Sequence, residues 1–452
     1  MKTRKTVLIQ VKMEISQVSP NQMINKRKNG GIDMEFLKQA EIQESDQSAD
    51  TEKIVKDIIS NVRSNGDEAV KKYEETLSNS FRPLKVEEDE IKESTDSLSP
   101  EIKTLIERVV ERVSSFAEAQ LECLTPFEKE FGPGIRMGHK IIPIEKVGAY
   151  VPGGRFPLLS SGPMVVAPAK VAGAKQIVAC SPANYKGGIH PAVLYGLKCS
   201  GADHIYAIGG AQAISAMAYG TETIPEVDVI GGPGNRFVAE AKRQVFGKVG
   251  IDLIAGPSEI LVFADETAEP KKCAADLLAQ AEHDPNARAI IVSTSRTIAT
   301  RTIEEVNTYL KEFSSDSPAH ESWANMGEVI YAESMNEGIR ICNEIAIEHL
   351  HLHLKDSRSI MDQFTNYGSI FLGADSSVVF SDKVSGTNHT LPTQKAARYT
   401  GGLWVGNYVK VATHQEITGE GIEYLADHST KQSNVEGLEG HHLSAAVRLS
   451  DM

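Results

Sequence analysis

The chain has 452 residues, of which 41% are hydrophobic and 24% are charged, so it can bury a large core and suggests two major domains with smaller appendages. It carries 47 basic and 61 acidic residues, and the net charge of −14 argues against nucleic acid as a partner, because phosphate binding needs clustered positive charge. No apolar run reaches the roughly 20 residues of a membrane span, so we expect no membrane partner either.

The first 33 residues are basic and polar, and their apolar run TVLIQV is too short for the core of a secretory signal. A targeting peptide is one interpretation, but the composition favours a disordered extension over residues 1–33. Met34 is an alternative start of the chain. The five cysteines form no CxxC pair, which favours the reducing cytoplasm.

The spacing of apolar residues changes near residue 140. Before it, apolar residues recur at helical spacing from Ile54 to Val62, and charged helical patterns continue, so we expect a helical region over residues 34–139. After it, short β-rich runs end in Gly or Pro and lead into helices: QIVACSP, HIYAIGG, VDVIGGPG, EILVFAD and AIIVSTS. This alternation predicts an α/β fold with parallel sheets covered by helices on both faces.

Two of the predicted strands lead into glycine-rich turns, AIGGAQ at residues 207–212 and IGGPGN at residues 230–235. Glycines at such turns let backbone amides approach a phosphate at a helix N-terminus. The second turn lacks the third glycine of the dinucleotide fingerprint. Taken alone, each is therefore an ordinary connection between a strand and a helix.

Four segments far apart in the chain supply groups that bind a divalent metal or move a proton. They contain Gln280 and His283, Glu348 and His349, Asp382 and His389, and His441. The run from Pro270 to Glu282 predicts a helix that places Gln280 and His283 together near its last turn. Asp382 and His441 would complete a zinc set of nitrogen and oxygen ligands. The alternatives are a helix cap or turn residue for Asp382 and a solvated histidine for His441.

The sequence IEHLHLHL follows a predicted helix over residues 335–346. Strand alternation places His349, His351 and His353 on one face. We expect His351 and His353 to be polar residues on the open face of a strand.

Ordered blocks of the chain resemble the histidinol dehydrogenase family from about Glu35 to Arg448. The blocks are VGAYVPGG, GGAQAISAMAYGT, GGPGNRFVAEAKRQV, AGPSEILVFAD, AQAEHDP, EHL, SGTNHTLPT, and His441 followed seven residues later by Arg448. The resemblance implies two incomplete Rossmann-like domains, over residues 140–260 and 261–395, that look like a duplication. We expect part of the helical region over residues 34–139 to pack with the second of them. It also implies a homodimer that exchanges its C-terminal segments, residues 396–452.

The resemblance assigns roles to residues that match the family's motifs. It implies one zinc ion per subunit and NAD as cofactor. Catalysis falls on Glu348 and His349. The remaining assignments are NAD contacts at Tyr150, Gln212 and Asn235, zinc ligands at Gln280, His283, Asp382 and His441, and substrate contacts at Ser258, His389 and Glu436.

The implied reaction oxidises a primary alcohol to a carboxylate through an aldehyde, with two hydride transfers to NAD. His349 would take the protons, since imidazole titrates near neutrality. Glu348 would activate the water that attacks the aldehyde. Zinc would hold and polarise the substrate.

Two segments differ from the biosynthetic pattern and resemble paralogues such as sulfopropanediol 3-dehydrogenase. They are GGRFPLLSS, with Arg155, and the stretch after SGTNHTLPT. A guanidinium binds a sulfonate well, so we expect oxidation of 2,3-dihydroxypropane-1-sulfonate to sulfolactate. Arg155 is otherwise a surface residue or a cofactor contact. The alternative substrate is L-histidinol. A zinc hydrolase and a non-catalytic zinc-stabilised protein are the remaining alternatives.

Overall fold

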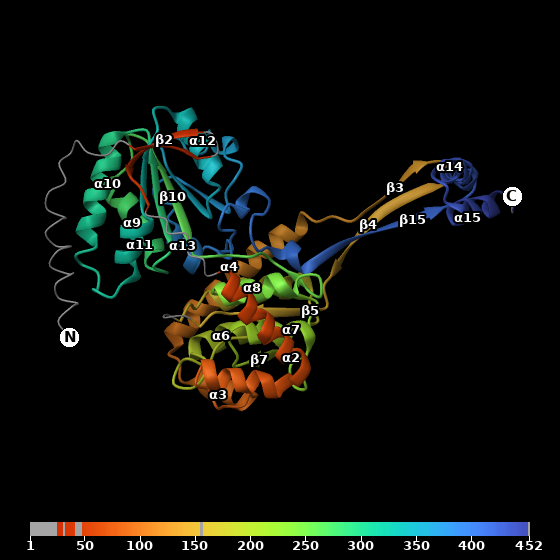
Figure 1. Ribbon diagram of the computed structural model, residues 1–452, viewed down its shortest axis with the longest axis horizontal. Helices are drawn as coiled ribbons and strands as arrows, with labels where there is room; N and C mark the ends of the chain where they lie inside the picture. The colour runs from red at the N-terminus through yellow and green to blue at the C-terminus, as the bar shows by residue number, and fades with distance from the viewer. Residues whose placement is uncertain (1–24, 30–31, 41–47, 154–156, 451–452) are drawn as a thin grey trace.

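The computed structural model describes residues 25–29, 32–40, 48–153 and 157–450 of the chain. Two α/β units form the body, and an arm that carries the C-terminus projects from it (Figure 1). Among the residues described, no helix is both long and apolar enough to cross a membrane.

The first α/β unit is built on five parallel strands in the spatial order β7-β6-β5-β8-β9. The strands are β5 (Lys146–Tyr150), β6 (Gln176–Cys180), β7 (His204–Tyr206), β8 (Val229–Gly231) and β9 (Gly250–Ile251). The helices between them are α5 (Ser161–Ala172), α6 (Pro191–Ser200), α7 (Gly210–Tyr219) and α8 (Arg236–Val245). The β-rich runs QIVACSP, HIYAIGG and VDVIGGPG thus form strands β6, β7 and β8, as the sequence predicts.

Three N-terminal helices complete both faces of this unit. They are α2 (Ser48–Leu77), α3 (Glu88–Asp96) and α4 (Pro100–Glu122). Helix α2 packs against α7 and α8, whereas α3 contacts α6, and α4 packs against α5 and α6. These N-terminal helices therefore pack onto the helices of the first unit.

The second α/β unit has a seven-stranded sheet in the order β1-β2-β12-β11-β10-β13-β14. Its strands are β1 (Asn25–Asn29), β2 (Ile32–Lys38), β10 (Glu259–Ala264), β11 (Arg288–Ser293), β12 (Glu328–Tyr331), β13 (His349–His353) and β14 (Ser369–Leu372). Its helices are α9 (Pro270–Ala281), α10 (Arg296–Tyr309), α11 (Pro318–Met326), α12 (Met335–Ile345), α13 (Val378–Lys383) and the 3-10 turn η1 (Met361–Gln363). Strands β10 to β14 are parallel to one another.

The two units share one strand order. When the strands of each unit are numbered along the chain, both parallel sheets read 3-2-1-4-5, which is the Rossmann order without its sixth strand. The α/β prediction and the pair of incomplete Rossmann-like units are confirmed. The shared topology also exhibits the duplication that no repeat in the sequence reveals.

The N-terminal segment departs from the prediction of disorder over residues 1–33. Strand β1 lies within that range and pairs antiparallel with β2, which in turn pairs antiparallel with β12. The hairpin covers an edge of the second sheet that would otherwise present unpaired backbone groups. Residues 1–24 lie outside the described part of the chain.

The arm is a three-stranded antiparallel sheet with a helical tip. Its strands are β3 (Phe127–Gly132), β4 (Ile135–Pro143) and β15 (Val409–Ile417), and its helices are α14 (Glu420–Glu436) and α15 (Glu439–Ser450). Two 3-10 turns, η2 (Ala396–Arg398) and η3 (Val405–Tyr408), precede β15. The expectation of helix over residues 34–139 is wrong at both ends. Residues 34–38 lie in β2, which pairs with β12, and from Phe127 onward the chain forms β3 and β4, of which β4 pairs with the distant β15.

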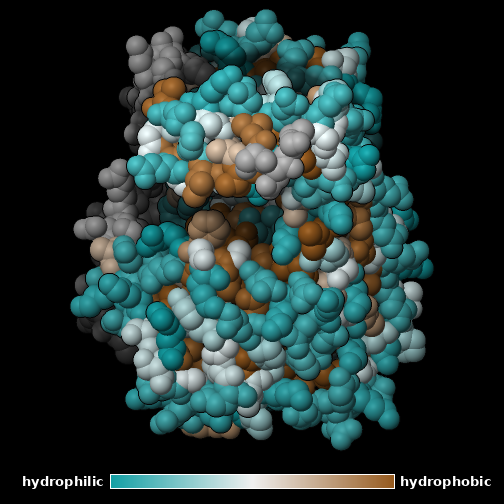
Figure 2. Space-filling model, turned by 90° about the vertical axis from the view of Figure 1, so that its right-hand side faces the viewer, coloured by the Kyte–Doolittle hydropathy of each residue, from teal (hydrophilic) through white to brown (hydrophobic). Residues whose placement is uncertain are grey.

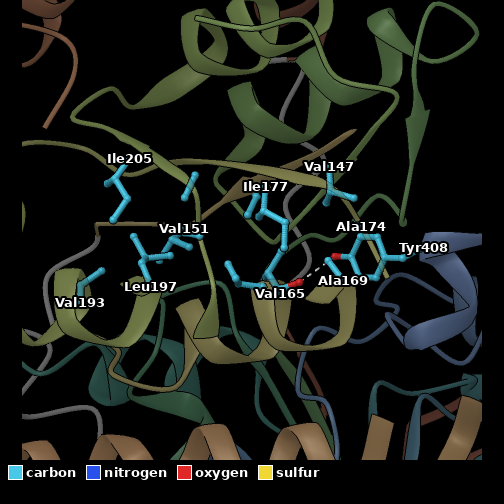
Figure 3. Close-up of a cluster of buried hydrophobic side chains, with 14 of the residues drawn as sticks. Val147, Val151, Val165, Ala169, Ala174, Ile177, Val193, Leu197, Ile205 and Tyr408 are labelled. Carbon is cyan, nitrogen blue, oxygen red and sulfur yellow. Dashed lines mark hydrogen bonds between the residues drawn. The ribbon is translucent and has the colours of Figure 1, made fainter. Parts of the chain in front are cut away.

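The base of the arm is fixed in the core of the first unit. Tyr408 is fully buried among apolar side chains such as Val147 and Ile177. Its hydroxyl donates a hydrogen bond to the carbonyl of Val165 at 3.0 Å, drawn as the dashed line in Figure 3. The direction in which the arm leaves the body is therefore set by buried contacts.

Candidate active site between the two α/β units

A cavity of about 780 Å³ lies between the two units, within the range of small-molecule and cofactor sites. The first unit lines it with the turns that follow β5, β7 and β8, at the carboxyl end of its sheet. The second unit contributes the turn before β10, the end of α9, the start of β13 and α13. Carboxyl ends of parallel strands beside a change in strand order are the usual ligand positions in such sheets.

Most of the predicted site residues line this one cavity. They are Tyr150, Gln212, Asn235, Ser258, Gln280, His283, Glu348, His349, Asp382 and His389. Glu436 and His441 instead lie exposed on α14 and α15 of the arm, away from the cavity lining. Arg155 lies outside the described residues. One chain thus assembles three of the four predicted zinc ligands.

Gln280 and Asp382 are held together at the second-unit side of the cavity. The amide nitrogen of Gln280 donates to Oδ2 of Asp382 at 2.9 Å, which leaves the amide oxygen, the atom able to bind a metal, for another partner. Burial opposes ionisation of Asp382, but the imidazoles of His349 and His389 and the Gln280 bond lower the pKa of its carboxyl. A carboxylate, an amide oxygen and the imidazole of His283 therefore line the same wall.

The orientation of His349 follows from its bond to the main chain of Glu259. Nδ1 of His349 lies 2.9 Å from that carbonyl oxygen, which only accepts, so Nδ1 carries the proton. Nε2 then holds a lone pair, and this buried atom has no hydrogen-bond partner among the described residues. Burial also lowers the pKa of His349. The imidazole is thus a neutral base with its free nitrogen at the cavity.

Glu348, beside it at the start of β13, is held by the same main-chain segment. The backbone N–H of Glu259 donates to Oε2 of Glu348 at 2.7 Å. Burial raises the pKa of Glu348 well above its usual range, and the carboxylates of Glu259 and Asp382 raise it further. A cation bound nearby would favour the ionised form.

The predicted cofactor residues of the first unit make internal hydrogen bonds. The hydroxyl of Tyr150 accepts from the N–H of Gly210 at 3.1 Å. The amide of Gln212 donates to Oε1 of Glu74 at 2.8 Å, while its own oxygen has no partner among the described residues. Asn235 caps α8 by accepting from two backbone N–H groups. These side chains fix the glycine-rich turns and leave one orphaned amide oxygen at the cavity wall.

The sequence did not predict several buried residues that make hydrogen bonds to the cavity-lining turns. Glu74 of α2 accepts from the N–H of Gly209 as well as from Gln212. Buried Lys242 pairs with Asp252, and both bond the main chain of Gly232 in the second glycine-rich turn. Glu259 stands inside the AGPSE block, but its role uses its backbone, which no side-chain pattern reveals.

The prediction for His351 and His353 is wrong. Both do lie on the same face of β13 as His349, but that face is covered by α9, and both side chains are fully buried. The error has a physical reason, since the inner strands of a parallel sheet are covered on both faces and have no open side.

Comparison with known proteins agrees with this architecture. The family model described as histidinol dehydrogenase matches residues 41–449. The sulfopropanediol 3-dehydrogenase of Ruegeria pomeroyi is 39% identical over 92% of this chain and 96% of its own length. The histidinol dehydrogenase of Methanosarcina barkeri is 40% identical over 87% and 90%.

A solved structure of histidinol dehydrogenase from Elizabethkingia anophelis superimposes with a TM-score of 0.85 at 34% identity, covering 91% of this chain and 94% of that chain. The matches extend over both α/β units and the arm. The chain belongs to the histidinol dehydrogenase family of oxidoreductases.

Proposed function

We propose that the protein is a zinc-dependent, NAD-linked dehydrogenase that oxidises a primary alcohol to a carboxylate through an aldehyde. The observation that carries this proposal is the buried pair of Glu348 and His349, with a free imidazole nitrogen, beside the potential ligands Gln280, His283 and Asp382. On the opposite wall lie the glycine-rich turns of the first unit.

The donor set fits zinc. An imidazole, a carboxylate and an amide oxygen are nitrogen and oxygen ligands of the kind that zinc accepts. Three protein ligands leave a position for substrate, and His441 from another copy would supply the fourth protein ligand. When bound, zinc would polarise the alcohol or aldehyde oxygen.

The first unit fits a dinucleotide. Its cavity wall holds two glycine-rich turns at helix N-termini, and the unpartnered oxygen of Gln212 is buried beside one of them. Such turns suit a pyrophosphate. Bound there, NAD would accept a hydride in each of the two oxidation steps, with Tyr150, Gln212 and Asn235 along its path.

In the second unit, His349 and Glu348 transfer protons in different steps of the reaction. Nε2 of His349 accepts the hydroxyl proton as the alcohol is oxidised and returns it to the carbonyl oxygen when water adds to the aldehyde. It then accepts a hydroxyl proton of the aldehyde hydrate in the second oxidation. Glu348 takes a proton from the water that adds to the aldehyde carbon, once a cation has brought the carboxyl to its ionised form. Ser258 and His389 hold the substrate.

The favoured substrate is 2,3-dihydroxypropane-1-sulfonate, which would yield sulfolactate. Lys383 lines the cavity and offers a positive charge to an anionic substrate, and Arg155 follows the turn after β5 in the sequence. The alternative is L-histidinol, whose ammonium would suit Glu436. Sequence identity to the two kinds of relative is nearly equal, so it favours neither.

A homodimer would complete the site. Large apolar side chains are exposed on the arm: Phe127, Phe131, Val411, Tyr424, Val435, Leu438 and Leu443. Figure 2 looks at the molecule from the end that carries the arm and shows hydrophobic patches on this face. Exposed apolar surface of this kind is typical of an interface. Exchanged arms would bring Glu436 and His441 to the partner's cavity.

The test is NADH formation by zinc-loaded protein with 2,3-dihydroxypropane-1-sulfonate and, in parallel, with L-histidinol. We expect two NADH per molecule of sulfonate consumed. Two NADH with histidinol alone would assign the biosynthetic reaction. No NADH from either alcohol, or turnover of a carbonyl substrate without NAD, would contradict the proposal and favour a zinc hydrolase.

A further inference from the structure

A second group of metal-binding side chains lies outside the cavity, buried between α9 and the second sheet. Asp276 comes from the middle of α9, and His351 and His353 come from β13. Oδ2 of Asp276 is 3.2 Å from Nδ1 of His351 and 3.0 Å from Nε2 of His353, and these two nitrogens are 3.2 Å apart. None of the three residues lines the cavity.

When both histidines are neutral, the protons available do not satisfy these three atoms. Nε2 of His351 lies 2.9 Å from the carbonyl oxygen of Gly373 and must donate to it, so Nδ1 of a neutral His351 is a bare lone pair. An ionised Asp276 also presents only lone pairs. With both imidazoles neutral, at most one proton, on Nε2 of His353, lies among the three atoms, and the contact between Oδ2 of Asp276 and Nδ1 of His351 has none. A buried carboxylate needs a cation, and in the described part of the chain the ion-pair partners of Asp276 are these two histidines alone, which carry charge only when protonated.

The side-chain atoms that point away from the centre of the cluster make hydrogen bonds of the kind seen around bound metals. Gly373 fixes the ring of His351, and the hydroxyl of Ser377 donates to Oδ1 of Asp276 at 2.7 Å. Sγ of Cys273, one turn earlier on α9, lies 3.5 Å from Nδ1 of His353. Metal ligands commonly use their remaining atoms in such bonds.

We propose that Asp276, His351 and His353 bind a structural zinc ion, distinct from the ion of the cavity. A tetrahedral zinc with bonds of about 2.0–2.1 Å separates its ligand atoms by roughly 3.3 Å, close to the separations observed. Two imidazoles and one carboxylate suit zinc. The ion links α9 to β13 directly and to the start of α13 through Ser377. These three elements carry Gln280, His349 and Asp382.

The test counts zinc in the full-length protein after exhaustive dialysis, by elemental analysis. We expect two ions per chain in the unaltered protein. Asp276→Asn should lose one ion, and so should His283→Asn, which disables the cavity site. The double variant should hold none. Glu269→Gln, at the exposed start of the same helix, is the matched control and should keep both. Because the two sites are counted separately, failure of the proposed cavity zinc is distinguishable from failure of this one.

Two further measurements do not depend on the fold of Asp276→Asn. Adding zinc to metal-stripped His283→Asn protein should raise its melting temperature by several degrees, since a ligand of the native state stabilises it. Crystals of the unaltered protein should give an anomalous peak at the zinc edge between Asp276, His351 and His353. No peak there, together with an unchanged zinc count in a folded Asp276→Asn variant, would overturn the proposal.

Discussion

At the scale of single residues, burial acts in opposite directions on two neighbours. It lowers the pKa of His349 and raises the pKa of Glu348, because a low-dielectric environment disfavours the charged form of each. The imidazole is thereby kept as a neutral base. The raised pKa opposes ionisation of the Glu348 carboxyl, and a nearby cation would favour the ionised form, so its use as a base depends on the loaded site.

Replacing His349 should slow turnover strongly while the rest of the site stays in place. His349→Asn keeps a polar group but removes the free Nε2, and we expect kcat to fall by about 10²–10⁴-fold, the usual contribution of a general base. The measurement is steady-state NADH formation, with zinc content confirmed to be unchanged. His320→Asn, on α11 away from the cavity, is the control and should retain full activity. Equal activity of the two variants would remove His349 from the mechanism.

Glu348→Gln should separate the two oxidation steps. The glutamine keeps the size of the side chain and accepts the N–H of Glu259, but it cannot take a proton from water. We therefore expect the first hydride transfer to persist and hydration of the aldehyde to slow, so that the yield falls from two toward one NADH per alcohol. Aldehyde trapping with a hydrazine reagent would quantify the missing product. A slower reaction that still delivers two NADH would contradict this role.

At this site, residues could be predicted from the sequence where they belong to a motif of metal-binding or proton-transferring side chains. The positions of Gln280, His349 and Asp382 in one cavity follow that prediction. The pairing of His351 and His353 with Asp276 does not, because it depends on which helix covers β13. The support from Glu74 and from the main chain of Glu259 likewise arises from tertiary contacts that leave no local signature.

At the scale of elements, the glycine-rich turn after β8 shows how closely two strands constrain each other. Gly232 has a φ of +117°, and a Cβ built there would lie 1.9 Å from the carbonyl oxygen of Tyr150. The main chain of β5 thus occupies the space of a side chain. Lys242 and Asp252 bond the same glycine, so the turn is fixed from both sides.

Gly232→Ala should therefore be far more damaging than an alanine at a comparable turn. Gly247 also has a positive φ, +99°, but nothing lies within 4 Å of its virtual Cβ. For Gly247→Ala we expect a loss of about 1–3 kcal/mol in the free energy of unfolding, from backbone strain alone. Gly232→Ala should lose more than about 4 kcal/mol or fail to fold. Denaturant unfolding of both variants measures the difference, and equal losses would show that the contact with Tyr150 relaxes readily.

At the scale of the whole molecule, the body was predictable and the arm was not. Buried parallel strands leave short, nearly continuous apolar runs, so β6, β7, β8, β10 and β11 are visible in the sequence. Strand β3 is exposed, β4 is mostly half-buried, and neither carries such a run. The outer partner of β4 is β15, which lies more than 250 residues away in the chain. Exposed strands stabilised by distant pairing give little periodic signal.

The proposed exchange of arms makes a prediction that concerns two copies of the chain. A subunit with His349→Asn has a damaged cavity but an intact arm, and one with His441→Asn has the reverse. If His441 serves the partner's cavity, a mixed dimer contains one complete site, and refolding the two inactive variants in equal amounts should restore about a quarter of the normal activity, since half of the dimers are mixed. Each variant refolded alone is the control. If His441 served its own chain, every site in the mixture would lack one residue and activity would stay at the level of the controls.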